Sequence, residues 1–282
     1  MKIKIIYIYI IFLIINLMPM KQVLAIIPFY NLPNAKDLKR ESIEIAKSAY
    51  QLLIYGQKEE SLRLAELAIS LNSNDETIWA ILTEIQIANQ LFDEALISIK
   101  EGKRLNAEMS EFYFAESSIY LKQKKFRRAK TALLEGLQIT PDNYNAIFQL
   151  GNIFLIEKNY RKAIIEFEKA ILINPNFWQA INNKGLAFFE LDKKLLAVNS
   201  FKEAIKINEN AETLLALAAS LENNNPEAIL LAKKALTKDP QYVSYEYRKE
   251  QLWGEKLQNS TKELFLLEEL ENDIRFAKKY LN

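Results

Sequence analysis

Large and small apolar residues recur along this chain in a pattern that repeats every 34 residues. The repeating units open at Ser42, Glu76, Ser110, Tyr144, Trp178 and Glu212. A fixed period of this length is typical of architectures in which one small structural unit is stacked on the next. The pattern therefore predicts six consecutive units over residues 42–242: 42–75, 76–109, 110–143, 144–177, 178–211 and 212–242.

The unit 144–177 shows the pattern most clearly. Small residues stand at its positions 8, 20 and 27, as Gly151, Ala163 and Ala170. Small side chains let two helices approach closely, while large side chains between them fill the remaining space. Pro175 at position 32 ends a helix, because proline lacks an amide donor and restricts the residue before it. Each unit is therefore predicted to be a helical hairpin whose exposed apolar face is covered by its neighbours.

This pattern resembles the tetratricopeptide-repeat (TPR) family. In the unit 144–177 the resemblance holds at every signature position except position 4, where Ile147 replaces Trp. The units 76–109, 110–143 and 178–211 follow the same frame. The resemblance implies an all-α fold: a right-handed superhelical solenoid of TPR hairpins with a concave surface.

The end units depart from the frame. The first, 42–75, has Ser61 where Ala is expected, and the last is shortened by a turn over residues 223–226. Residues 26–41 are predicted to be a linker. Residues 243–282 are predicted to form two capping helices, one running through Trp253 and one opened by Ser260, with Glu263 completing a capping box.

Residues 1–25 have the features of a targeting segment. Two lysines are followed by an apolar run over residues 5–18, which is short for a membrane-crossing helix and suits a signal peptide. Cleavage is expected after Ala25, and the alternative is an uncleaved anchor formed by residues 5–20. The protein is therefore expected to be exported, to a periplasm or thylakoid lumen, or to be membrane-anchored. With no cysteine, lipid attachment through a thioether is excluded.

Composition narrows the chemistry. Lys plus Arg is 37 and Asp plus Glu is 36, so the chain lacks the basic excess typical of nucleic-acid binding. The absence of Cys and His removes thiol nucleophiles and the commonest metal ligands and general base. No catalytic residue, cofactor or metal is predicted. The basic run 122–130 is interpreted as an exposed turn, and Glu268, Glu269 and Glu271 as a solvated helix face.

The resemblance to TPR proteins implies that a partner binds along the concave face, which is built by the first helix of each hairpin. Carried onto this sequence, it selects Glu111, Phe114, Ser118, Asn145, Phe148, Gln149, Asn152, Gln179, Asn182 and Asn183. Their amides could pair with the backbone of an extended peptide, or they could simply be solvated surface. Chaperone-binding TPR domains hold the carboxylates of a partner with Lys and Arg at concave positions. The residues at position 5 of these units are not basic, so such a clamp is not expected.

The expected function is therefore a non-catalytic protein-protein interaction scaffold that holds a protein or an extended peptide. Cyanobacterial and plastid TPR proteins that assist photosystem assembly are similar in carrying an apolar N-terminus before the repeats, so a role as assembly factor for a membrane complex is included. The alternatives are a self-associating structural subunit and an enzyme with an unrecognised site within residues 243–282. The sequence predicts no oligomeric state.

Overall fold

The computed structural model describes residues 34–222 and 225–280, and all regular elements in these ranges are helical. The chain divides into two compact units, Met1–Leu38 and Lys39–Asn282. The predicted signal peptide or anchor over residues 1–25 lies outside the described residues. Within the described ranges, no helix combines the length and apolar character needed to cross a bilayer.

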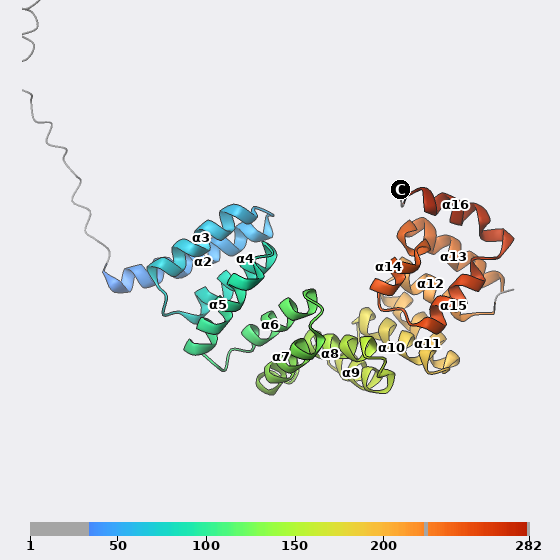
Figure 1. The fold of residues 1–282 in the computed structure, drawn as a ribbon, viewed down its shortest axis with the longest axis horizontal. Helices are drawn as coiled ribbons and strands as arrows, with labels where there is room; N and C mark the ends of the chain where they lie inside the picture. Colours follow the sequence, from blue (N-terminus) through green and yellow to red (C-terminus); the bar gives the residue numbers. More distant parts are fainter. Residues whose placement is uncertain (1–33, 223–224, 281–282) are drawn as a thin grey trace, which may run out of the picture. The chain divides into compact units, whose positions relative to one another are not determined.

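The predicted hairpins are present and follow one another along the chain (Figure 1). Their paired helices are α2 (Ala35–Ile54) and α3 (Lys58–Leu71), α4 (Glu76–Ala88) and α5 (Phe92–Leu105), α6 (Ser110–Lys122) and α7 (Phe126–Ile139), α8 (Tyr144–Ile156) and α9 (Tyr160–Ile173), α10 (Trp178–Glu190) and α11 (Lys194–Ile207), and α12 (Ala211–Ser220) and α13 (Pro226–Lys238). Four first helices begin at the residues that open the predicted units. The all-α solenoid of TPR hairpins is therefore confirmed.

Small residues stand where the two helices of a hairpin meet. Ala163 is fully buried, and Gly151 faces the ring of Phe167 so closely that a Cβ atom at this glycine would lie 2.5 Å from Cε1. Gly185 and Phe201 repeat the same contact in the next hairpin, at 2.6 Å. The pairing of a small and a large residue, which the sequence pattern predicted, brings the two helices of these hairpins close together.

In four hairpins the turn uses a left-handed residue that is not glycine, whereas the turn of the first hairpin uses Gly56, with φ of 79°. Gln90, Lys124, Lys158 and Asp192 have φ between 56° and 63° and are spaced by the repeat period. Each is followed by an amide that donates to the carbonyl five residues earlier, as Leu91 N does to Gln86 O at 2.9 Å. This bond satisfies a carbonyl at the helix end, so the turn tolerates the unfavourable φ.

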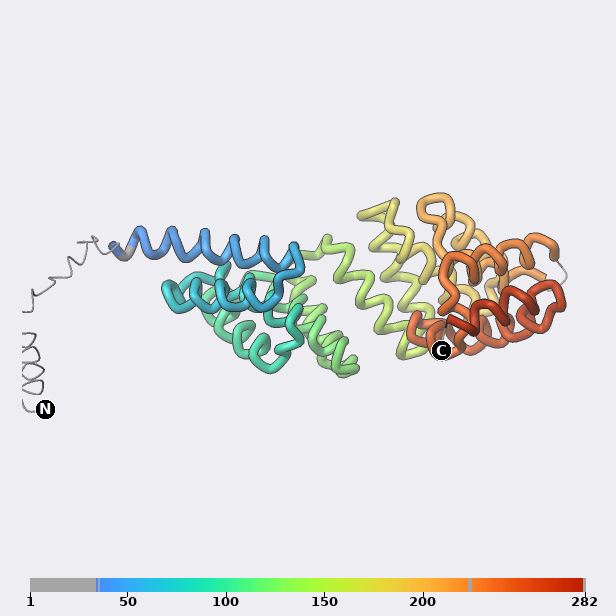
Figure 2. The backbone as a smooth tube through the Cα atoms, turned by 90° about the horizontal axis from the view of Figure 1, so that it is seen from above, coloured from blue at the N-terminus to red at the C-terminus, as the bar shows by residue number. Residues whose placement is uncertain are grey.

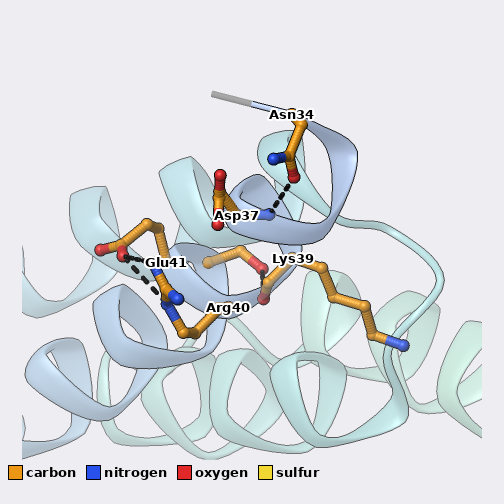
Figure 3. A network of polar contacts seen from close by, with 6 residues as sticks. Asn34, Asp37, Lys39, Arg40 and Glu41 are labelled. Atoms are coloured by element: carbon orange, nitrogen blue, oxygen red, sulfur yellow. Dashed lines mark hydrogen bonds and ion pairs between the residues drawn. The ribbon is translucent and has the colours of Figure 1, made fainter. Parts of the chain in front are cut away.

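Helix α2 begins earlier than predicted. The side-chain oxygen of Asn34 accepts a hydrogen bond from the amide of Asp37 at 3.0 Å and so caps the first turn (Figure 3). Residues 35–41 are therefore helical, and the predicted linker 26–41 is wrong at this end. Residues 26–33 of that linker lie outside the described residues.

The C-terminal region contains more elements than predicted: η1 (Pro240–Val243), α14 (Tyr245–Glu250), α15 (Glu255–Leu264), η2 (Glu268–Leu270) and α16 (Glu271–Lys279). The prediction that Ser260 opens a helix is wrong, because it lies inside α15. The first turn of α15 is capped instead by Glu190 of α10, whose carboxylate accepts from the amide of Leu257 at 3.1 Å. A cap supplied from another repeat leaves no local sequence signal.

These C-terminal elements pack on two sides of the last repeats. Helix α16 lies against α13 and η1, and α15 lies against α12 and α10 (Figures 1 and 2). The segment therefore caps the end of the solenoid, as predicted, and also covers first helices, which was not predicted.

Candidate functional site

The first helices α2, α4 and α6 form an open groove. It consists of two adjoining hollows of about 380 and 980 Å³, and both are lined by Tyr50, Glu84, Glu111 and Ala115. These side chains stand at the first-helix positions that the TPR frame assigns to ligand contact. We call this surface the α2–α6 groove.

The walls of the α2–α6 groove are mainly apolar. Leu53 and Ile54 contribute from α2, Ile87 from α4, and Phe114 from α6. The ring of Phe114 lies over Gly136 of α7, where a Cβ atom would come within 2.5 Å of the ring. The absence of a side chain at Gly136 therefore allows the Phe114 ring to occupy this position in the wall of the groove. An exposed apolar surface of this kind is typical of a protein-binding site.

Two carboxylates, those of Glu84 and Glu111, line both hollows of the groove. Neither makes a salt bridge within the described residues. Both remain accessible to solvent, but the helices around Glu84 desolvate its carboxylate and raise its pKa; the charge of Glu111 adds to the rise and the Tyr50 hydroxyl opposes it. The groove therefore offers negative charge that has no cationic partner.

Lysines stand elsewhere along the same groove. Lys47 is paired with Glu44 at 2.8 Å, and Lys58 and Lys122 line the larger hollow only. The smaller hollow thus has a single lysine, which is already paired.

Five of the ten predicted site residues come together on open surface. Glu111, Phe114 and Ser118 line the α2–α6 groove. A further hollow of about 230 Å³ between α6 and α8 is lined by Phe114 and Ser118 again, with Asn145 and Gln149. These five residues therefore line neighbouring hollows, and their contact with a partner stays a prediction.

Phe148, which was predicted to contact the partner, has a packing role. Its ring contacts those of Phe177 and Phe167, with centroids 4.9 and 5.7 Å away, and it is partly buried. Such an aromatic cluster stabilises the contact between neighbouring hairpins. Phe148 does not line the α2–α6 groove or the hollow between α6 and α8.

Asn182 and Asn183 are buried, and the expectation that they are exposed is wrong. Asn183 donates to Asn152 Oδ1 at 2.8 Å, and Asn182 donates to Glu212 Oε1 at 3.0 Å and to Asn183 Oδ1 at 3.2 Å. The three amides and the carboxylate thus form a chain of hydrogen bonds across α8, α10 and α12. Gln179 at the start of α10 is partly buried.

The C-terminal segment explains this burial. Nine of the ten residues of α12 are buried, because α11 and α13 cover one side and α15 covers the other. Trp253, just before α15, is 4% exposed and belongs to the same apolar cluster as α12. The first-helix face is therefore open from α2 to α8 and covered at α10 and α12.

Sequence reasoning missed the residues of α2 and α4 that complete the groove, above all Tyr50 and Glu84. Both stand at position 9 of their units, the position that selected Ser118 and Asn152. The repeat frame could therefore have identified them. Among the described residues, no group of three or more Asp or Glu side chains is arranged to hold a metal ion.

Comparisons with known proteins agree with this architecture. Family models for the tetratricopeptide repeat match residues 110–143, 144–177 and 179–211. A search of curated proteins gives no match.

Among solved structures, similarity extends to PilF of Pseudomonas aeruginosa, with 17% identity, a TM-score of 0.63, and coverage of 78% of this chain and 99% of that one. MamA of Desulfovibrio magneticus RS-1 is 18% identical, with a TM-score of 0.54 and coverage of 61% and 95%. YrrB is 18% identical, with a TM-score of 0.50 and coverage of 62% and 93%. The three matched repeats lie within residues 110–211, and the hairpins on either side continue their period, so this part of the chain consists of tetratricopeptide repeats.

Proposed function

We propose that this protein is a non-catalytic scaffold that holds a segment of a partner protein in the α2–α6 groove. The observation that carries the proposal is the contrast along the first-helix face, which is open and apolar from α2 to α6 and covered by the chain itself at α10 and α12. YrrB, a neighbour in fold, is described as a TPR protein with an unusual peptide-binding site. That description supports peptide binding as the kind of activity to test.

The chemistry of the groove indicates the kind of segment that fits. Apolar side chains of the partner would contact Leu53, Ile87 and Phe114, and a lysine or arginine would lie between Glu84 and Glu111. Such a cation would relieve the repulsion between the two carboxylates. Asn145 and Gln149, beside the groove, would pair with the backbone of the bound segment.

A pair of charge reversals tests the site. The titrant is a partner protein first isolated by affinity capture on the wild-type protein. Glu84→Lys places a cation in the groove, and we expect it to weaken binding of this partner at least tenfold in titration calorimetry, because like charges then face each other. Glu168→Lys makes the same change on exposed surface of α9 and serves as the control. Equal affinity of both variants and the wild type would remove the groove as the binding site.

The setting of the scaffold is a further part of the proposal. The apolar segment before the repeats supports export or membrane tethering, and a scaffold held there could assist assembly of a membrane complex. N-terminal sequencing of the mature protein tests this part: a chain beginning at Ile26 indicates cleavage. A chain that keeps residues 1–25 and stays in the membrane after carbonate extraction indicates an anchor.

A further inference from the structure

A second site lies in the C-terminal segment, around Arg248. This side chain is only 3% exposed, although arginine is rarely buried without a partner. Its Nε donates to Gln258 Oε1 at 2.9 Å, and its Nη1 donates to the carbonyl of Tyr242 at 2.6 Å. Gln258 is itself buried and is held by a bond from its amide to the carbonyl of Tyr245 at 3.2 Å. The guanidinium is therefore fixed in orientation by groups on both sides.

Within the described residues no carboxylate pairs with this buried cation. Both of its hydrogen-bond acceptors are neutral, and its other neighbours are the rings of Phe265 and Trp253, with the guanidinium carbon 5.4 and 6.0 Å from their centroids. Desolvation lowers the pKa of Arg248 to about 10, so it remains charged at neutral pH. A buried charge without a counter-ion is costly. The position therefore suits an anion that comes from outside.

Arg248 lines a hollow of about 320 Å³, whose polar lining also includes Gln258, Asn259, Lys262 and Lys278. All charged residues that line it are basic. Its apolar lining includes Phe265 and Leu266, and Leu266 is 77% exposed. The guanidinium Nη2 has no hydrogen-bond partner among residues 34–222 and 225–280. The site thus combines basic side chains, a guanidinium nitrogen without a partner and apolar side chains.

We propose that this hollow binds a carboxylate attached to an apolar side chain, as found at the C-terminus of a polypeptide that ends in Leu, Ile or Phe. A planar carboxylate matches the fork of the guanidinium donors, and Lys262 and Lys278 add to the attraction. The apolar side chain packs on Phe265 and Leu266. The adjoining hollow, which is also lined by Lys278, contains Glu268 and Glu271. Their carboxylates repel an anion, so the ligand carboxylate binds near Arg248.

This site is separate from the α2–α6 groove, because none of its residues belongs to the helices that line the groove. Loss of one activity can therefore be measured without loss of the other.

The test uses the full-length protein labelled with ¹⁵N on arginine, with the Arg248 Nε–H signal assigned from the spectrum of Arg248→Lys. We expect N-acetyl-L-leucine to shift this signal with a Kd on the order of 1 mM, as for a small ligand held by few contacts. N-acetyl-L-leucinamide lacks the carboxylate and should leave the signal unchanged. N-acetylglycine lacks the apolar side chain and should bind several-fold more weakly.

The double variant Lys262→Gln, Lys278→Gln should fold like the wild type, because both lysines are exposed. Its affinity for N-acetyl-L-leucine should be about fivefold lower than that of the wild type, and its melting temperature should be unchanged. Equal binding by the amide, by N-acetylglycine or by the double variant would overturn the proposal. A response to inorganic phosphate without a response to N-acetyl-L-leucine would also overturn it, because the site would then be one for phosphate groups.

Discussion

The Glu212 carboxylate provides a quantitative test of how the C-terminal segment is held. It lies between α10, α12 and the segment around Trp253, and it accepts a hydrogen bond from Asn182 at 3.0 Å. Desolvation raises the pKa of Glu212 to about 7, and the side chains of Asn182, Trp253 and Tyr242 oppose this rise. The indole Nε1 of Trp253 has no hydrogen-bond partner within the described residues, so we regard its effect as electrostatic.

The direction of the pH effect follows from this shift. Below pH 4.5 the carboxyl is neutral in both the folded and the unfolded chain, so it adds no pH dependence. Between pH 4.5 and about 7 the folded chain holds the proton that the unfolded chain releases, so stability falls as pH rises. The shift from 4.5 to about 7 corresponds to a loss of up to about 3 kcal/mol.

We expect Glu212→Gln to remove this loss, because glutamine can still accept from Asn182 but carries no charge. The measurement is urea unfolding of both proteins from pH 5 to pH 8, followed by the difference between their free energies of unfolding. Taking the difference cancels the titration of other carboxylates. The variant should gain up to about 3 kcal/mol relative to the wild type over this range. Parallel pH profiles would refute the claim that a desolvated carboxylate lies beneath the C-terminal segment.

Two further predictions concern the packing. Ala163→Leu should lower stability by about 1–3 kcal/mol, since this buried alanine stands where the helices of a hairpin meet; a melting temperature equal to that of the wild type would contradict the close approach. Asn182→Ala should cost about 1–3 kcal/mol, since it leaves Glu212 and Asn183 without its bonds. Asn145→Ala removes an exposed amide and is the matched control. Its free energy of unfolding should lie within about 0.5 kcal/mol of the wild-type value in the same urea titration.

Sequence alone determined the repeat. Alanine, glycine and proline recur at fixed positions because two helices can approach closely only where side chains are small, and this constraint applies to every hairpin in the same way. The pairing of Gly151 with Phe167 could therefore be read from spacing, and four first helices begin where the period places them. The position of the groove along these helices follows from the same frame.

Tertiary structure decided which part of that face is open. Gln149 and Asn183 both stand at position 6 of their units, on neighbouring first helices, yet Gln149 is exposed and Asn183 is buried. The difference comes from α15, whose first turn is capped by Glu190 from a distant repeat, and from Glu212 and Trp253. Each of these contacts joins residues far apart in the chain and is made only once. Such contacts therefore leave no repeating pattern in the sequence. The burial of Arg248 likewise becomes visible only when the C-terminal segment is folded, because its partners Tyr242 and Gln258 come from different elements.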